Sequence, residues 1–165
     1  MAMSRKYRRV NCHLVVSRIL VPHDGTEMSD RALEKATEFA RALKADIIIA
    51  HIVDSRFVPP SATLSYISDR TSLEGAKTEL VEILKSGAEQ MLKEKMAKIK
   101  AEGIGVDFIL GVGSPADEIV SIARSTESDL IVMGSRQLKS NIIASLGSVA
   151  RKVLDTAHCP VMIIR

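Results

Sequence analysis

The stretch Asp46-Ile-Ile-Ile-Ala-His-Ile-Val53 decides the fold class of this 165-residue chain. It is rich in β-branched residues and apolar on both faces, a pattern typical of a central strand in a parallel sheet. The shorter apolar stretch Arg18-Ile-Leu-Val-Pro22 precedes it, and Pro22 and Gly25 end that stretch as a buried strand would end. Between the two, residues 27–44 predict a helix. Its apolar face comprises Leu33, Ala36, Ala40 and Leu43.

The rest of the chain continues this alternation of strands and helices. Three more strands are predicted at Val106–Leu110, Asp129–Met133 and Pro160–Ile164, and three more helices at about residues 73–101, 115–125 and 149–157. The apolar face of the long helix comprises Leu80, Leu84, Ala88, Met91 and Ile99, and that of the last helix Val149, Ala150, Val153, Leu154 and Ala157. Residues 54–72 show no periodicity, so we expect a loop there. The order predicts one α/β domain over residues 18–165, with a parallel sheet and helices on both faces.

The charge distribution separates the first 17 residues from the rest. They carry Arg5, Lys6, Arg8 and Arg9 and no acidic side chain, although the whole chain has a net charge of only +3. We interpret residues 1–17 as a basic extension outside the domain. Aromatic residues make up 3% of the chain and tryptophan is absent, so the stacking surfaces of single-strand binders are missing. No DNA or RNA partner is expected.

Hydropathy and cysteine content are typical of a cytoplasmic globular protein. The longest purely aliphatic stretches, such as Val161–Ile164, are far shorter than the roughly 20 residues of a membrane span, so no membrane partner is expected. Cys12 and Cys159 offer neither a disulfide framework nor a metal-ligand spacing. Cys159 precedes Pro160 and a buried strand, and we interpret it as a small core residue rather than a nucleophile.

A ligand site is expected at the carboxyl ends of the strands, where parallel sheets of this type bind ligands. The loop after the fourth strand begins with Gly134-Ser135-Arg136 and returns through Leu146-Gly147-Ser148 into a helix. Glycine lets backbone N–H groups approach a phosphate, and a helix N-terminus adds donors and a favourable dipole. From the pattern alone, a strand-end turn at Gly134 and a helix cap at Gly147 explain these residues equally well.

Asp24 is a second candidate, at the end of the first strand and across the crevice from this loop. Its carboxylate could accept hydrogen bonds from ribose hydroxyls. The alternative is a turn or N-cap residue of the helix that follows, since Asp-Gly is a strong turn dipeptide. The neighbouring His23 could touch a phosphate or be a plain loop residue.

The segment from Gly134 to Ser148 resembles the ATP-binding signature of the universal stress proteins, which reads glycine, two residues, glycine, nine residues, then glycine and serine or threonine. Three other segments resemble the same family in order, at Ile19–Thr26, Ala50–Asp54 and Cys159–Ile164. The resemblance implies a five-stranded parallel sheet of order 3-2-1-4-5 and a homodimer formed through the final strand, Val161–Ile164. An apolar strand at a sheet edge independently favours such pairing.

The resemblance also implies roles for single residues. Asp24 would hold the ribose, Ile52 would meet the adenine through its backbone, and Gly134, Gly147 and Ser148 would cradle the phosphates of ATP, bound with Mg²⁺. Gln137 stands where the signature has its second glycine. If that position needs positive φ, a side chain costs about 1–2 kcal/mol, so we expect weakened phosphate contact rather than its loss. The candidate binding residues are Pro22, His23, Asp24, Ile52, Gly113, Met133, Gly134, Ser135, Arg136, Gln137, Gly147, Ser148 and Val149.

The expected function is nucleotide binding with a regulatory role in the stress response. No side chain stands out as a general base aimed at a phosphate, so slow or no turnover is expected. Two alternatives stay open. One is a nucleotide-free dimer that acts through protein contacts, which Gln137 motivates, and the other is a slow ATPase or nucleotide hydrolase on the same fold.

Overall fold

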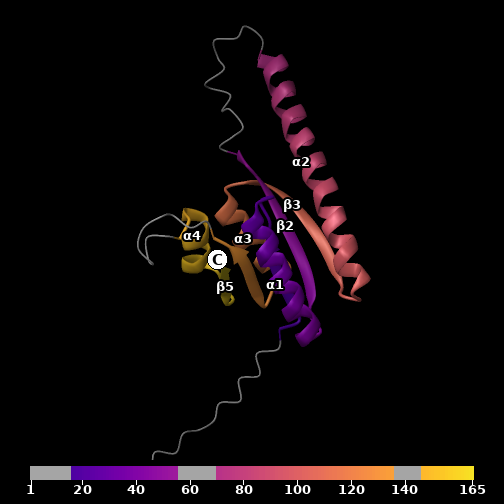
Figure 1. The fold of residues 1–165 in the computed structure, drawn as a ribbon. Helices are drawn as coiled ribbons and strands as arrows, with labels where there is room; N and C mark the ends of the chain where they lie inside the picture. The colour runs from indigo at the N-terminus through magenta and orange to yellow at the C-terminus, as the bar shows by residue number, and fades with distance from the viewer. Residues whose placement is uncertain (1–15, 56–69, 136–145) are drawn as a thin grey trace, which may run out of the picture.

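The computed structural model describes residues 16–55, 70–135 and 146–165. Most of the basic extension, Arg136 and Gln137 lie outside these residues. The elements are β1 (Arg18–Pro22), α1 (Glu27–Leu43), β2 (Asp46–Asp54), α2 (Arg70–Ala101), β3 (Val106–Gly113), α3 (Pro115–Ser125), β4 (Leu130–Gly134), α4 (Ser148–Thr156) and β5 (Val161–Ile164). This alternation of strands and helices confirms the predicted α/β class (Figure 1).

β1 lies at the centre of a parallel sheet whose strand order is β3-β2-β1-β4-β5, as expected. The chain moves outward from β1 to β2 and β3, and then returns to β4 on the other side of β1. β1 pairs with β2 only as far as Pro22, opposite Ala50, whereas β2 and β3 continue to Asp54 opposite Gly113. A crevice is therefore expected past the end of β1, at the point where the strand order reverses.

Two apolar cores lie on the two faces of the sheet. One core joins the sheet to α1 and α2, and its fully enclosed side chains include Ile19, Ile47 and Leu92. The other joins the sheet to α3 and α4, and includes Leu20, Ile131 and Val153. Ile19 and Leu20 are adjacent and point to opposite faces, as expected of a strand buried on both sides.

The apolar faces of three helices differ in part from those predicted. Leu80 and Leu84 on α2 are 39% and 43% exposed, because the N-terminal half of this helix extends past the sheet (Figure 1). Its buried line comprises Ala88, Leu92, Met96 and Ile99. Leu43, at the last residue of α1, and Leu154 on α4 are also exposed rather than inward. Helical periodicity identified the right elements but not where each helix leaves the sheet.

Of the residues expected in a loop over 54–72, Asp54 belongs to β2 and residues 70–72 belong to α2, while residues 56–69 lie outside the described residues. The first five residues of α2, residues 70–74, include neither glycine nor proline, so nothing in them prevents a helix from starting. Cys159 is half-buried against the core under α3 and α4, and burial raises the pKa of its thiol. Within the described residues, no helix combines the length and apolarity needed to cross a membrane.

Candidate ligand-binding cavity

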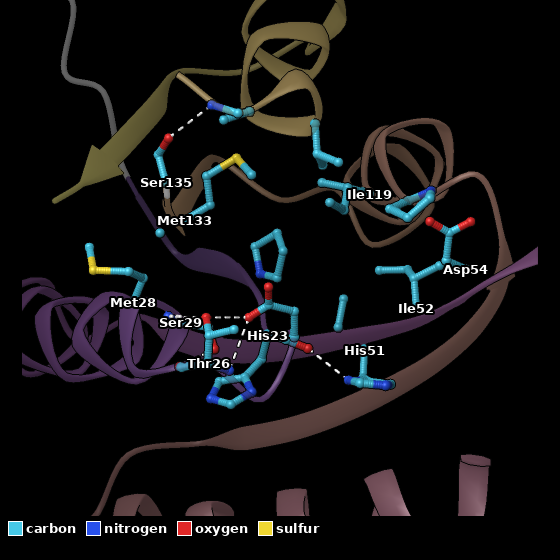
Figure 2. A pocket seen from close by; sticks show the side chains of 18 of the residues that line it. His23, Thr26, Met28, Ser29, His51, Ile52, Asp54, Ile119, Met133 and Ser135 are labelled. Carbon is cyan, nitrogen blue, oxygen red and sulfur yellow. Dashed lines mark hydrogen bonds between the residues drawn. The ribbon is translucent and has the colours of Figure 1, made fainter. Parts of the chain in front are cut away.

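A cavity of about 620 Å³ lies past the carboxyl ends of β1, β2 and β4 (Figure 2). Ten of the predicted binding residues line it: Pro22, His23, Asp24, Ile52, Met133, Gly134, Ser135, Gly147, Ser148 and Val149. Gly113 is not among the lining residues. A Cβ there would meet the Glu118 carboxylate at 2.7 Å, so this glycine accommodates a side chain of α3. Arg136 and Gln137 lie outside the described residues.

The two ends of the loop between β4 and α4 meet at the cavity. The Gly147 N–H donates to the Ser135 hydroxyl at 3.3 Å, and Ser135 is itself held by a bond from its N–H to the Ile164 carbonyl at 3.0 Å (Figure 2). Gly147 is the N-cap residue of α4, and as a glycine it provides no side chain to bond the first N–H groups of the helix. The α4 N-terminus therefore opens onto the cavity with donors that its own cap residue leaves unused.

Gly134 and Gly147 are glycines for different reasons. A Cβ on Gly134 would lie 2.5 Å from the Met28 carbonyl oxygen and 2.6 Å from its carbon, which are backbone atoms in the first turn of α1. Gly147 has an ordinary φ of −58°, and a Cβ there would meet no described atom within 4 Å. Packing of the described residues thus requires glycine at position 134 but not at 147.

The turn between β1 and α1 forms the floor of the cavity. Asp24 Oδ1 accepts from the N–H of Thr26 (3.1 Å) and from its hydroxyl (2.6 Å). Gly25 adopts φ +82°, in the left-handed region that favours glycine. Thr26 caps α1 by accepting from the Ser29 N–H. The turn role considered for Asp24 is present, the N-cap role belongs to Thr26, and the Asp24 carboxylate also lines the cavity.

The His23 side chain is completely enclosed beneath this turn. Its Nδ1 accepts from the Gly25 N–H (3.2 Å), which fixes the ring proton on Nε2, the atom 2.9 Å from Asp30 Oδ1. Desolvation lowers the pKa of His23 below its usual 6.5, and the positive charge of Lys95 acts in the same direction, although Asp30 and Asp24 oppose it. His23 is therefore a neutral, structural part of the cavity wall.

The end of β2 presents backbone groups to the cavity. The His23 N–H donates to the Ala50 carbonyl at 2.8 Å, so the N–H and C=O groups of Ala50 face β1. The side to which the backbone N–H and C=O groups point alternates from one residue to the next along a strand. Ile52 is therefore the next residue of β2 whose groups point toward the β1 side. Because β1 has already ended there, no backbone hydrogen bond joins Ile52 to a described residue on that side. One donor and one acceptor of Ile52 thus face the cavity.

Several lining residues were not predicted. Six of these residues lie on helices: Met28 and Ser29 from α1, Leu84 from α2, Pro115 and Ile119 from α3, and Ala150 from α4. His51 also lines the cavity, and its Nδ1 donates to the His23 carbonyl at 2.8 Å (Figure 2). The expectation that ligands bind at the carboxyl ends of the strands identifies residues that follow strands, and it does not identify residues on helices. Only the Ser114-Pro115 helix start after β3 gave a sequence signal.

The fold and this cavity define a doubly wound α/β protein with a ligand crevice at the switch point of its sheet. The model of the universal stress protein family matches residues 16–165. Universal stress protein MJ0531 of Methanocaldococcus jannaschii is 32% identical over 149 residues, which cover 90% of this chain and 81% of that protein. The chain belongs to the universal stress protein family.

Solved structures agree in fold. That of protein MJ0577, also from Methanocaldococcus jannaschii, superimposes with a TM-score of 0.75 at 27% identity, covering 91% of this chain and 96% of that one. A universal stress protein of Archaeoglobus fulgidus in complex with dAMP gives a TM-score of 0.58 at 24% identity, covering 92% of this chain and 99% of that one. The second similarity concerns the fold alone.

Proposed function

We propose that this protein binds an adenine nucleotide, ATP in the first place, in the cavity past β1, β2 and β4, and that it acts as a nucleotide-dependent regulator. The observation that carries the proposal is the N-terminus of α4, which opens onto the cavity and has no capping side chain among the described residues. Such a terminus attracts anions, because its N–H groups and the helix dipole both favour negative charge.

The charges around α4 support a phosphate there. α1 and α3 both carry acidic residues in their first turns, Glu27 and Asp30 in one and Asp117 and Glu118 in the other. α4 has no acidic residue in its first turn. Its positive end is therefore not neutralised by its own side chains. Because no described atom lies within 4 Å of a Cβ position on Gly147, a phosphate could also approach this backbone closely.

The opposite part of the cavity suits a nucleoside. Ile52 offers one backbone donor and one acceptor, which match the ring nitrogen and amino group on the edge of adenine. Ile119 and Leu84 add apolar surface for a base. Asp24 would accept from a ribose hydroxyl while it also holds the turn. That a family member was solved with dAMP agrees with this choice of ligand.

A magnesium ion would come with the nucleotide. The described residues contain no group of three histidine, cysteine or acidic side chains that could hold a metal ion. Mg²⁺ usually keeps several waters and binds through phosphates and one or two carboxylates. Phosphate oxygens and water would therefore supply most of its ligands here.

We also propose a homodimer formed along β5. This strand is at the edge of the sheet, and its four residues, Val161–Ile164, are only half-buried. An apolar edge strand of this kind is stabilised by pairing with another strand, and a second copy of β5 would provide it.

The test of nucleotide binding adds a charge to the α4 N-terminus. Ser148 is exposed and is the first residue of the helix. Titration calorimetry should give binding of ATP to the wild-type protein, and about tenfold weaker binding to Ser148→Asp than to the neutral variant Ser148→Asn, which lacks the hydroxyl but adds no charge. An acid in the first turn stabilises a helix by about 0.3–1 kcal/mol, so the weaker binding would not come from unfolding. Absence of wild-type binding at millimolar ATP would refute the proposal.

A further inference from the structure

A chain of hydrogen bonds connects the helix α2 to the cavity floor through the buried His23. At one end, Lys95 of α2 donates to Asp30 of α1. Asp30 also accepts from His23 Nε2 at 2.9 Å, and His23 Nδ1 accepts from the Gly25 N–H at 3.2 Å. The three side chains come from α2, α1 and the turn between β1 and α1, which also carries Asp24 (Figure 2 shows the His23 end).

Each link in this chain has a fixed direction. The Gly25 N–H can only donate, so Nδ1 of His23 must be an acceptor. The ring proton is then on Nε2, and it points to Asp30. Desolvation raises the pKa of Asp30, but the hydrogen bonds and charges of Lys95 and His23 together lower it below its usual value, so Lys95 helps to keep Asp30 ionised. The hydrogen bond from the Gly25 N–H to His23 therefore exists only while the imidazole is neutral.

We propose that Lys95 and Asp30 act as positioning residues, which through a neutral His23 hold the Asp24–Thr26 turn in the form that binds the ligand. The inference builds on the proposed nucleotide site, because it assigns a regulation to that site. A proton added to His23 Nδ1 would turn this acceptor into a donor facing the Gly25 N–H. The two donors cannot bond to each other, so the turn would move and ligand affinity would fall with pH.

The charges around His23 determine the pH at which its ring gains this proton. Asp30 of α1 and Asp24 of the turn favour the protonated ring, whereas Lys95 of α2 opposes it. From β2, His51 contributes only its Nδ1 bond to the His23 carbonyl. Removal of Lys95 deletes the positive charge that opposes protonation of His23. The Asp30 carboxylate, which also loses its ion pair with Lys95, then interacts more strongly with His23. The pKa of His23 should therefore rise in a Lys95→Met protein.

The experiment compares Lys95→Met with the control Lys93→Met on the same helix. Lys93 pairs with Glu89 on the surface at 2.7 Å, and its side chain is 64% exposed. Its substitution therefore removes the same charge but leaves the hydrogen bonds among Lys95, Asp30 and His23 intact. ATP affinity is measured by calorimetry from pH 8 to pH 5. If only the neutral form binds, affinity falls by up to about tenfold for each pH unit below the His23 pKa. Lys95→Met should lose affinity at a higher pH than the wild type, and Lys93→Met should match the wild type.

A second measurement does not depend on ATP. NMR of the ligand-free proteins follows the His23 ring signals and the Gly25 amide signal through the same pH range. Both should change together, and at a higher pH in Lys95→Met. In His23→Asn the side-chain carbonyl can replace Nδ1 as acceptor for the Gly25 N–H but cannot titrate. This variant should bind ATP with little pH dependence, whereas His23→Leu should bind weakly at every pH.

The outcomes separate the two proposals. If no protein binds ATP but the His23 and Gly25 signals still shift with Lys95→Met, the nucleotide proposal fails and the coupling stands. If ATP binds and Lys95→Met has the same pH profile as Lys93→Met, the nucleotide proposal stands and the coupling is refuted. An unchanged His23 titration in Lys95→Met would also refute the coupling.

Discussion

Gly134, the last residue of β4, lies directly against the backbone of Met28: a Cβ on Gly134 would be 2.5 Å from the Met28 carbonyl oxygen. This contact brings the first turn of α1 onto the end of β4 and closes one side of the cavity. The glycine that sequence reasoning connected with phosphate binding is thus required by packing of the protein itself. Gly147, in contrast, has no described atom within 4 Å of its Cβ position.

The two glycines should respond differently to substitution by alanine. Gly134→Ala forces a methyl group into backbone atoms that cannot rotate away, so we expect a loss of about 1–3 kcal/mol in the free energy of unfolding. Gly147→Ala only replaces one N-cap residue by a poorer one, and it should cost less than about 1 kcal/mol. Urea denaturation of both variants measures the difference.

The same two variants separate an effect on stability from an effect on ATP binding. Gly147→Ala should weaken ATP binding despite its near-normal stability, because the methyl group would occupy the space next to the α4 N-terminus. Equal stability losses in the two variants would contradict our account of Gly134.

The backbone groups of Ile52 predict a preference for adenine over guanine. Adenine presents an amino donor beside a ring acceptor, whereas guanine presents a carbonyl acceptor beside an N–H donor, so guanine would place like groups against the N–H and C=O of Ile52. One mismatched hydrogen bond is worth about 1 kcal/mol or more, which predicts binding of GTP at least about fivefold weaker than ATP. Purine riboside triphosphate lacks the amino group and should fall between them. Equal affinities for ATP and GTP would exclude this role for Ile52.

The buried His23 should make stability depend on pH. Its pKa is lower in the folded protein than the 6.5 of an exposed histidine, so the unfolded chain binds more protons between these two values. The stabilising contribution is complete above pH 6.5 and decreases as pH falls toward the folded pKa. The steepest slope that one proton can produce is about 1.4 kcal/mol per pH unit.

Denaturation of wild-type and His23→Asn protein at a series of pH values tests this prediction. The difference in unfolding free energy between them should change below pH 6.5. Asp30 acts in a separate range, because its pKa is lowered from 3.8 and its contribution is lost only as pH falls below that value. A difference that stays constant between pH 7 and pH 4.5 would show that His23 is not buried in its neutral form.

The proposed dimer can be tested at one backbone N–H. Bonds from Ile131 to the Pro160 carbonyl and from Ser135 to the Ile164 carbonyl show that even-numbered residues of β5 face β4. The N–H of Ile163 therefore faces the open edge. Ile163→Pro removes it without breaking the pairing with β4, and should yield monomers, whereas Ile163→Ala should remain dimeric. Light scattering at micromolar concentration measures the molar mass of each protein. A wild-type protein with the mass of a monomer would refute the dimer.

Much of the architecture follows from local pattern in the sequence. The apolar run at Asp46–Val53 predicts a central parallel strand because a strand covered by helices on both faces must be apolar on both. The predicted element order and the sheet order 3-2-1-4-5 are both observed. Helical periodicity does not predict that α2 projects past the sheet at Leu80 and Leu84. Amphipathic spacing identifies the apolar face of a helix but not whether another element packs against it.

Residue order along single elements was enough to predict the class of fold, the family, and the edge of the sheet where a cavity forms. Contacts between elements were needed to show that Gly134 makes room for the Met28 backbone, that packing of the described residues does not require a glycine at position 147, and that His23 is linked to Lys95 through Asp30. Those relationships join residues far apart in the chain. They depend on how closely two backbones approach and on which atoms meet, and neither leaves a pattern that can be read along one element.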